Sequence, residues 1–160
     1  MRVASFFLAT ALLFNACLPA RTKVIRVVRH PEPSGKFTLP LKRVTILSKF
    51  GKRSGSFHTG LDLRGRRGGG DSVLASRAGR VVLVGRQSGY GLMITVVHGD
   101  GFKTRYAHLA KALVKKGALV KEQQPIGIVG RSGRASTEHL HFEVLTPKGR
   151  FVNPEPLLFG

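Results

Sequence analysis

Residues 57–63 place a histidine and a carboxylate at a spacing that could serve a metal ion. If this segment is one strand, alternate side chains point the same way, so His58, Gly60 and Asp62 share a face. The other face, which would turn to the core, carries Phe57, Leu61 and Leu63. Because Gly60 adds no side chain, it leaves room between the imidazole and the carboxylate.

Residues 138–144 form a second segment of this kind, with two histidines. The same alternation places His139, His141 and Glu143 on one face. The opposite, inward face carries Leu140, Phe142 and Val144. Two imidazoles on one strand face can point into a single site. A further candidate, His108, ends a strand-like run over residues 104–108.

Together these residues could form the site of a zinc hydrolase. Zinc in a hydrolytic site takes three histidine or carboxylate ligands and keeps a fourth position for water. It lowers the pKa of that water from ~15.7 towards ~7 and polarises the carbonyl that is attacked. His58, Asp62 and one histidine of residues 138–144 would complete such a set, and the remaining histidines could act as a base or stabilise the transition state. The alternative is that these are ordinary polar residues of strand faces, and spacing alone leaves both interpretations open.

The elements that must position these residues are predicted to be short β-strands. Beyond residue 37, apolar runs alternate with glycine-containing turns, a pattern typical of strands. The expected strands are Val81–Val84, Leu92–Val97, Phe102–Ala107, Pro125–Val129 and Leu140–Leu145. Gly99-Asp100-Gly101 separates two of them and predicts a hairpin. With only a weak helical pattern, over Leu109–Val114, we expect a mostly β domain with short connecting loops and little helix.

The first 20 residues predict a secretory signal peptide. Arg2 precedes an apolar stretch that is shorter than the ~18 residues of a membrane-spanning helix and ends in small residues. Phe14-Asn15-Ala16-Cys17 is similar to the lipobox of bacterial lipoproteins, although its first two residues depart from the usual pattern. Cys17 is therefore either lipidated, which would give a membrane-anchored lipoprotein, or not lipidated: ordinary cleavage after Ala16 would leave it at the N-terminus, and cleavage after Ala20 would remove it. Both alternatives predict an exported protein of the periplasm or cell envelope.

The chain is strongly basic, since 27 Lys and Arg against 8 Asp and Glu give a net charge of +19. Such a surface attracts polyanions, and export favours anionic polymers of the envelope over nucleic acid as partners. The single cysteine excludes a disulfide framework and a cysteine-rich zinc module. We expect residues 21–45 to be a linker, with one possible strand at residues 24–28, and residues 46–160 to form one domain.

Further motifs accompany the two histidine segments, in a fixed order between Lys49 and Phe159. They are Phe50-Gly51, Phe57-His58-Thr59-Gly60-Leu61-Asp62, Ala78-Gly79-Arg80-Val81-Val82, Gly89-Tyr90-Gly91, His98-Gly99, Tyr106-Ala107-His108-Leu109, Val114-Lys115-Lys116-Gly117, Pro125-Ile126-Gly127, Gly130-Arg131-Ser132-Gly133, His139-Leu140-His141-Phe142-Glu143 and Asn153-Pro154. This arrangement resembles the lysostaphin-like zinc metalloendopeptidases, which cut peptide cross-links of bacterial peptidoglycan. The resemblance implies the antiparallel-sheet fold of that family, with one zinc ion in the domain.

The resemblance also implies a role for each of five residues. His58, Asp62 and His141 match the zinc ligands, and His108 and His139 match the two histidines that do not bind zinc. One of these two would take the proton from the attacking water while the other supports the developing oxyanion, and we favour His139 as the base. The implied protein is a secreted or lipid-anchored monomer that acts on peptidoglycan stem peptides and cross-bridges during cell-wall remodelling.

Three alternatives require different chemistry. A catalytically silent regulator, which binds the wall and activates a separate amidase, would share the scaffold, but retention of all five positions argues against it. A biotinyl or lipoyl carrier, suggested by the segments at residues 114–117 and 125–127, would need a lysine in a tight hairpin turn, which is not evident. A nucleic-acid module rests on charge alone and lacks interleaved aromatic residues.

Residues outside the five positions carry weaker expectations. His98, beside the expected hairpin turn, is predicted to be structural, and His30 has no assigned role. The basic segment 64–71, with three glycines at residues 68–70, is either a mobile loop beside the ligands or a simple turn. Its arginines, and Arg86, Arg131 and Arg134, could meet carboxylates of stem peptides or anionic polymers, or only keep the surface solvated.

Overall fold

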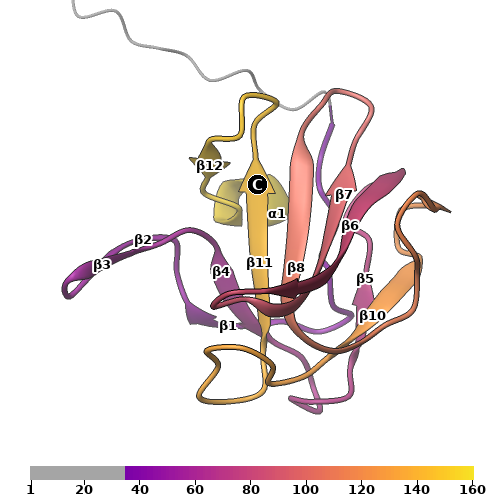
Figure 1. Ribbon diagram of the computed structural model, residues 1–160. Helices are drawn as coiled ribbons and strands as arrows, with labels where there is room; N and C mark the ends of the chain where they lie inside the picture. The colour runs from indigo at the N-terminus through magenta and orange to yellow at the C-terminus, as the bar shows by residue number, and fades with distance from the viewer. Residues whose placement is uncertain (1–34) are drawn as a thin grey trace, which may run out of the picture.

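Antiparallel strands dominate the structure, a computed structural model that describes residues 35–160 (Figure 1). The strands are β1 (Thr45–Ser48), β2 (Gly51–Arg53), β3 (Ser56–His58), β4 (Leu61–Arg64), β5 (Ser72–Leu74), β6 (Gly79–Gln87), β7 (Gly91–Val97), β8 (Lys103–Ala112), β9 (Leu119–Val120), β10 (Pro125–Val129), β11 (Leu140–Leu145) and β12 (Phe151–Val152), followed by the short helix α1 (Glu155–Phe159). The mostly β class with little helix is therefore confirmed. The expected leader with Cys17, the possible strand at residues 24–28 and His30 lie outside the described residues.

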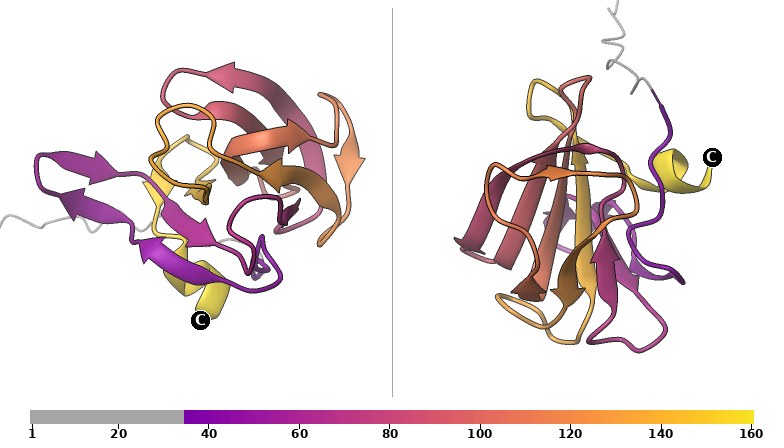
Figure 2. Two further views of the ribbon diagram at one scale, coloured as in Figure 1. Left: turned by 90° about the horizontal axis from the view of Figure 1, so that it is seen from below. Right: turned by 90° about the vertical axis from the view of Figure 1, so that its right-hand side faces the viewer.

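One large antiparallel sheet contains most of these strands, in the order β1-β4-β11-β8-β7-β6-β9. β10 pairs with β5 and with the end of β8, and β12 pairs with β11. The views in Figure 2 show that this sheet is strongly curved. β2 and β3 pair only with each other, and their hairpin projects from the large sheet (Figures 1 and 2).

The core is built from apolar side chains of the large sheet, among them Leu61, Leu63, Ile94, Tyr106 and Phe142, which are all fully buried. The inward direction predicted for Leu140, Phe142 and Val144 on β11 is confirmed, because all three belong to this core. Burying such side chains contributes roughly 1.5–3 kcal/mol each and is what holds the curved sheet together.

The segment before residue 46, expected to be a linker, takes part in this packing from residue 37 onward. Phe37 and Leu41 are buried in the core. The Phe37 N–H donates to Leu157 O at 3.4 Å, and Lys36 Nζ donates to Gly160 O at 3.0 Å. The chain therefore enters the domain beside α1, as the right-hand view of Figure 2 shows.

The expected strands reappear, but two are much longer than predicted: Val81–Val84 lies within the nine-residue β6, and Phe102–Ala107 corresponds to the ten-residue β8. β10 and β11 have the predicted bounds, and the predicted hairpin around Gly99-Asp100-Gly101 joins β7 to β8. The weak helical prediction over Leu109–Val114 is wrong, because β8 continues to Ala112 by pairing with β10. The described helix, α1, lies instead at the C-terminal end and was not predicted. In the described residues, no helix is long and apolar enough to cross a membrane.

Candidate metal centre

Asp62 and His141 are brought together by the pairing of β4 with β11. Their Cα atoms are partners in the antiparallel register, and Asp62 Oδ1 lies 2.9 Å from His141 Nδ1. The flanking residues Leu61 and Leu63 are fully buried, so the alternation of β4 turns Asp62 to the opposite side. This part of the sequence prediction is confirmed.

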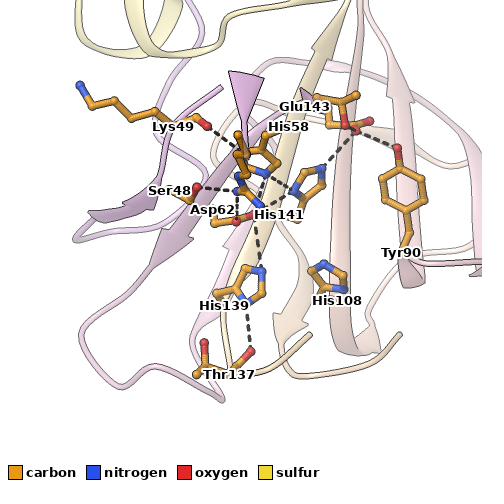
Figure 3. Close-up of polar contacts among 12 residues, drawn as sticks. Ser48, Lys49, His58, Asp62, Tyr90, His108, Thr137, His139, His141 and Glu143 are labelled. Atoms are coloured by element: carbon orange, nitrogen blue, oxygen red, sulfur yellow. Dashed lines mark hydrogen bonds and ion pairs between the residues drawn. The ribbon is translucent and has the colours of Figure 1, made fainter. Parts of the chain in front are cut away.

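His58 reaches the same place from a different element. The expectation that residues 57–63 form one strand is wrong, because β3 ends at His58 and pairs with β2, whereas β4 begins at Leu61. Phe57, expected in the core, is 54% exposed and packs against Phe50 with ring centroids 5.1 Å apart. Despite the break, His58 Nε2 lies 3.1 Å from Asp62 Oδ1 and 3.1 Å from His141 Nδ1 (Figure 3).

Gly60 is needed at the break for close packing and not for open space. A Cβ at this position would lie 2.3 Å from the Phe142 carbonyl oxygen and 2.9 Å from Glu143 Cγ. The room that the sequence suggested beside Gly60 is therefore filled by the backbone of β11. Only glycine allows residues 59–60 to pass so close to β11 between His58 and Asp62.

The rings of His58 and His141 each have one nitrogen that donates a hydrogen bond to the protein and one that keeps its lone pair. His58 Nδ1 lies 2.8 Å from the Lys49 carbonyl oxygen, which can only accept, so this nitrogen carries the proton. In the same way, His141 Nε2 donates to Glu143 Oε1 at 3.1 Å. In their neutral form the rings turn unprotonated His58 Nε2 and His141 Nδ1 towards each other and towards Asp62 Oδ1. Three electron-pair donors converge on one place, an arrangement that suits a cation.

The donor set and its spacing fit zinc. Histidine nitrogen and carboxylate oxygen bind zinc at about 2.0–2.2 Å, and tetrahedral geometry then separates neighbouring ligand atoms by roughly 3.4 Å. The three donor atoms here are separated by 2.9–3.1 Å. Small outward shifts of the rings would accommodate the ion. His58, Asp62 and His141 can therefore hold a metal ion, and three ligands leave a fourth position open.

His108 lies at a β-bulge, where the pairing of β8 with β11 ends and its pairing with β10 begins. Up to Ala107 the strand pairs with β11, and from Leu109 it pairs with β10. The register with β7 also shifts here, because Ile94 faces Tyr106 and Leu92 faces Leu109. His108 takes the left-handed conformation, with φ of 60°, which is unfavourable for a side chain other than glycine. Bulges redirect side chains, and His108 here lines the same cleft as His58, Asp62 and His141.

His139 faces His108 across the same cleft. The ring centroids of the two histidines are 4.8 Å apart, and His139 Nε2 lies 3.5 Å from Asp62 Oδ1. Each ring is held by its Nδ1–H, which donates to Ser132 O from His108 at 2.7 Å and to Thr137 O from His139 at 2.9 Å. Both Nε2 atoms are thus free of backbone contacts and can exchange a proton with a bound molecule. The five sequence-predicted site residues meet in one place, while their individual roles stay predictions.

Glu143 supports the site through a contact that the sequence analysis missed. Although it was placed on the histidine face of β11, it received no role. Glu143 is fully buried and fixes His141 from behind. Its carboxylate also accepts from Tyr90 Oη at 2.9 Å (Figure 3). It accepts as well from Thr59 Oγ1 at 2.5 Å and from Arg105 Nη1 at 3.3 Å. A glutamate two residues after the second histidine, on the same face, was the available signal.

The two carboxylates of the site, Asp62 and Glu143, both have lowered pKa values. Burial alone would raise the pKa of Asp62, but hydrogen bonds with His139, His141 and His58 outweigh it and hold that pKa well below its usual range. Burial would likewise raise the pKa of Glu143, but hydrogen bonds with His141 and Thr59 outweigh it and lower that pKa. Both carboxylates are therefore ionised at neutral pH.

These side chains line an open cleft of about 480 Å³, whose walls include Phe57, Tyr90, His108, His139 and two arginines, Arg53 and Arg134. Arg53 donates to Asp62 Oδ2 at 2.8 Å and to Ser48 Oγ. The sequence had singled out Arg134 but not Arg53. The remaining predicted candidate, His98, is structural as expected, because it is buried between Ala78 O and Thr104 Oγ1, each 3.0 Å from a ring nitrogen.

The basic loop at residues 64–71 is tied to the sheet and lines a different hollow. Gly70 N donates to Val129 O at 3.1 Å, and a Cβ at Gly69 would overlap the Glu138 carboxylate. The hollow, of about 590 Å³, is lined by Leu41, Lys42, Arg43, Gly65, Arg66, Arg67, Gly70, Asp71 and Ser72. None of its lining residues belongs to the metal centre, so these cations do not line the cleft.

Residues 56–154, more than half of the chain, match the model of peptidase family M23. The chain belongs to this family. All five predicted site residues and Glu143 lie within the matched range. The fold agrees too, because the catalytic domain of the antimicrobial peptidase lysostaphin from Staphylococcus simulans superposes with a TM-score of 0.68 at 29% identity, over 73% of this chain and 93% of that one. A zinc-containing peptidase from Vibrio cholerae superposes with a TM-score of 0.67 at 36% identity, over 74% of this chain and 39% of that one.

The names of similar proteins describe different roles: a cell division protein, an endopeptidase and an activator of hydrolases. The cell division protein DipM of Caulobacter vibrioides is 39% identical over 83% of this chain and 21% of its own length. The peptidoglycan DD-endopeptidase ShyB of Vibrio cholerae is 45% identical over 48% and 18%. The murein hydrolase activator EnvC of Escherichia coli is 42% identical over 56% and 21%. This M23 chain thus spans about a fifth of the length of these relatives.

Proposed function

We propose that this M23 protein is an exported zinc endopeptidase that hydrolyses peptide cross-links of bacterial peptidoglycan. The observation that carries the proposal is the convergence of His58 Nε2, Asp62 Oδ1 and His141 Nδ1 within 3.1 Å of one another, beside two further histidines. Three protein ligands with an open fourth position are the usual arrangement of catalytic zinc. The name of the relative ShyB, a peptidoglycan DD-endopeptidase, supports the choice of substrate.

When bound, zinc supplies a Lewis acid that polarises the attacked carbonyl and makes water more acidic. The chain's own residues do the rest. His139 takes a proton from the attacking water at Nε2 and delivers it to the leaving amine, and its ring is kept in place by Thr137 O. His108 donates Nδ1–H to Ser132 O, so it has a second proton, at Nε2, only as the imidazolium; in that form its Nε2–H donates to the carbonyl oxygen as negative charge develops. Glu143 keeps the His141 ring in the tautomer that turns Nδ1 towards the metal position.

The location of the protein follows from its substrate. Relatives named for peptidoglycan and murein support a place in the periplasm or cell envelope, and the signal peptide expected at residues 1–20 would bring the protein there. Lipidation of Cys17, the monomeric state and contact with anionic envelope polymers stay predictions. Residues 46–160 are proposed as the catalytic domain, with residues 37–45 packed onto it.

The second candidate function is a silent regulator that binds the wall and activates a separate amidase. The relative EnvC, named a murein hydrolase activator, favours it. The two candidates differ in chemistry, because an activator needs neither a metal nor the two cleft histidines. The presence of all three ligand atoms, and of both His108 and His139 in the same cleft with Nδ1 held by a backbone carbonyl, supports the enzyme.

Digestion of purified peptidoglycan tests the proposal, with the products separated and weighed by mass spectrometry. The zinc-loaded protein is compared with a chelated sample and with the His141→Ala variant. Loss of cross-linked dimers that needs both zinc and His141 would establish the endopeptidase, and the product masses would name the bond. Bound zinc without any cleavage, together with stimulation of an added amidase, would support the regulator instead.

A further inference from the structure

The two arginines that line the cleft, Arg53 and Arg134, differ in their ion pairing. Arg53 Nη2 forms an ion pair with Asp62 Oδ2 at 2.8 Å, so the charge of Arg53 is balanced within the chain. Arg134 lines the same cleft, yet none of the carboxylates in residues 35–160 comes within 4 Å of its guanidinium. A cation that faces a cleft without an internal partner is available to a bound molecule.

The base of Arg134 is held rigidly although its side chain is exposed. Its N–H donates to Gly89 O at 2.8 Å. The preceding residue, Gly133, has a φ of 75°, and a Cβ there would lie 2.3 Å from Gly91 N. Residues 132–134 are therefore seated on the turn between β6 and β7 and leave no space for another side chain at Gly133.

The same short segment also holds a cleft histidine. Ser132 O accepts from His108 Nδ1 at 2.7 Å, and Ser132 Oγ accepts from Leu92 N at 2.9 Å and donates to Leu109 O at 2.8 Å. Arg134 thus stands two residues from the group that fixes His108. Its position relative to the reacting bond is set by the backbone that orients the histidine.

We propose that Arg134 is a specificity-determining residue that binds a free carboxylate of the peptide substrate beside the bond to be cut. This inference rests on the proposed endopeptidase function and adds the chemical class of the substrate. Of the residues lining the cleft, the only carboxylate is Asp62, which is engaged by the histidines and by Arg53. An incoming carboxylate therefore meets Arg134 in a cleft whose lining carries one negative charge, that of Asp62, which is already paired, and an arginine fork matches the two oxygens of a carboxylate.

The test compares cross-linked peptide dimers isolated from peptidoglycan with the same dimers after their carboxylates are coupled to ammonia by a carbodiimide, which converts them to amides. The unmodified protein is expected to cleave the free-carboxylate dimers with a kcat/KM on the order of fivefold higher, since the ion pair is exposed to water. Arg134→Gln should bring this ratio close to one. The matched control, Arg131→Gln, removes the same charge from an exposed position outside the cleft lining and should keep the ratio.

The preference should also shrink as salt is added, because added ions screen an exposed charge pair. Equal cleavage of both dimers by the unmodified protein, or a ratio that Arg134→Gln leaves unchanged, would overturn the inference while the endopeptidase stands. If neither dimer is cleaved, the endopeptidase itself fails. Binding of the two dimers, measured by calorimetry in a His139→Ala background with and without Arg134→Gln, then still decides whether Arg134 recognises the carboxylate.

Discussion

Asp62 and His141 are direct partners across the antiparallel pairing of β4 and β11, with Asp62 Oδ1 2.9 Å from His141 Nδ1, although they lie 79 residues apart in the sequence. One ladder of backbone hydrogen bonds therefore sets the distance between two of the three ligand atoms. His58 joins them from a hairpin that is not part of this ladder. The metal centre depends on the sheet for two ligands and on the packing at Gly60 for the third.

Replacing either cleft histidine should separate metal binding from turnover. His139→Ala and His108→Ala remove a group that exchanges protons with substrate but is not one of the converging ligands. We expect each variant to keep one zinc per chain and to lose about 10²–10⁴-fold in kcat for peptidoglycan dimers. Zinc content by atomic spectroscopy and dimer cleavage are measured on the same samples. A variant that lost zinc as well would contradict the assigned division of roles.

Glu143→Gln should weaken zinc binding without unfolding the protein. The substitution keeps the size of the side chain but removes the charge that holds the His141 Nε2–H. Loss of such a supporting carboxylate typically costs about 10–100-fold in metal affinity. Competition with a chromophoric chelator measures the affinity, and Glu138→Gln, at an exposed position near the cleft, is the control. Equal zinc affinities of the two variants would mean that Glu143 does not position His141.

Gly60→Ala should destabilise the domain, because the new Cβ would lie 2.3 Å from the Phe142 carbonyl oxygen and a backbone shift must relieve the overlap. Overpacking of this kind costs about 1–3 kcal/mol of unfolding free energy, which urea unfolding followed by circular dichroism can measure. Gly85→Ala is the matched control, since a Cβ at Gly85 of β6 meets nothing within 4 Å. A Gly60→Ala variant as stable as Gly85→Ala would show that β11 can move aside.

Protonation of His98 should contribute to a loss of stability in mild acid. Burial lowers the pKa of His98 below the usual value of histidine, about 6.5. The charged groups that face the ring are Arg77 and Asp100, themselves paired at 2.9 Å. The unfolded chain then binds the extra proton first, so the stabilisation is present above about pH 6.5 and is lost as the pH falls towards the lowered value. The free energy of unfolding of the metal-free protein is measured between pH 7.5 and 5. His98→Gln should show a smaller decrease than the unmodified chain, and an equal decrease would exclude His98 as a source.

Much of the sheet was predictable because its strands are bounded by turn residues and face the core on a regular period. Pro125–Val129 and Leu140–Leu145 have the predicted bounds for this reason. The strand break at Thr59-Gly60 could not be read from the same period, because His58 and Asp62 stay in phase across it. The exposed Phe57 follows from that break, since the β2–β3 hairpin packs Phe57 on Phe50 instead of the core.

The sequence allowed the five site residues to be predicted, but not the residues that hold them in position. Alternation alone placed His139 and His141 on one face, whereas the division into ligands and cleft histidines came from the family resemblance. His108 could not be positioned from a local pattern, because its direction depends on β8 exchanging β11 for β10. Tyr90 meets Glu143 from the β6–β7 turn, and Arg53 reaches Asp62 from the β2–β3 hairpin, both through contacts that arise only in the folded chain.

The contact between residues 36–37 and the last residues has a consequence for rearranging the chain. Lys36 Nζ lies 3.0 Å from Gly160 O, so a short linker could join these two positions and the domain could be reopened at an exposed turn such as Lys115-Lys116. Such a circular permutant would keep every strand pairing of the metal centre. A fusion partner attached at either of the two original positions would leave the domain from nearly the same point.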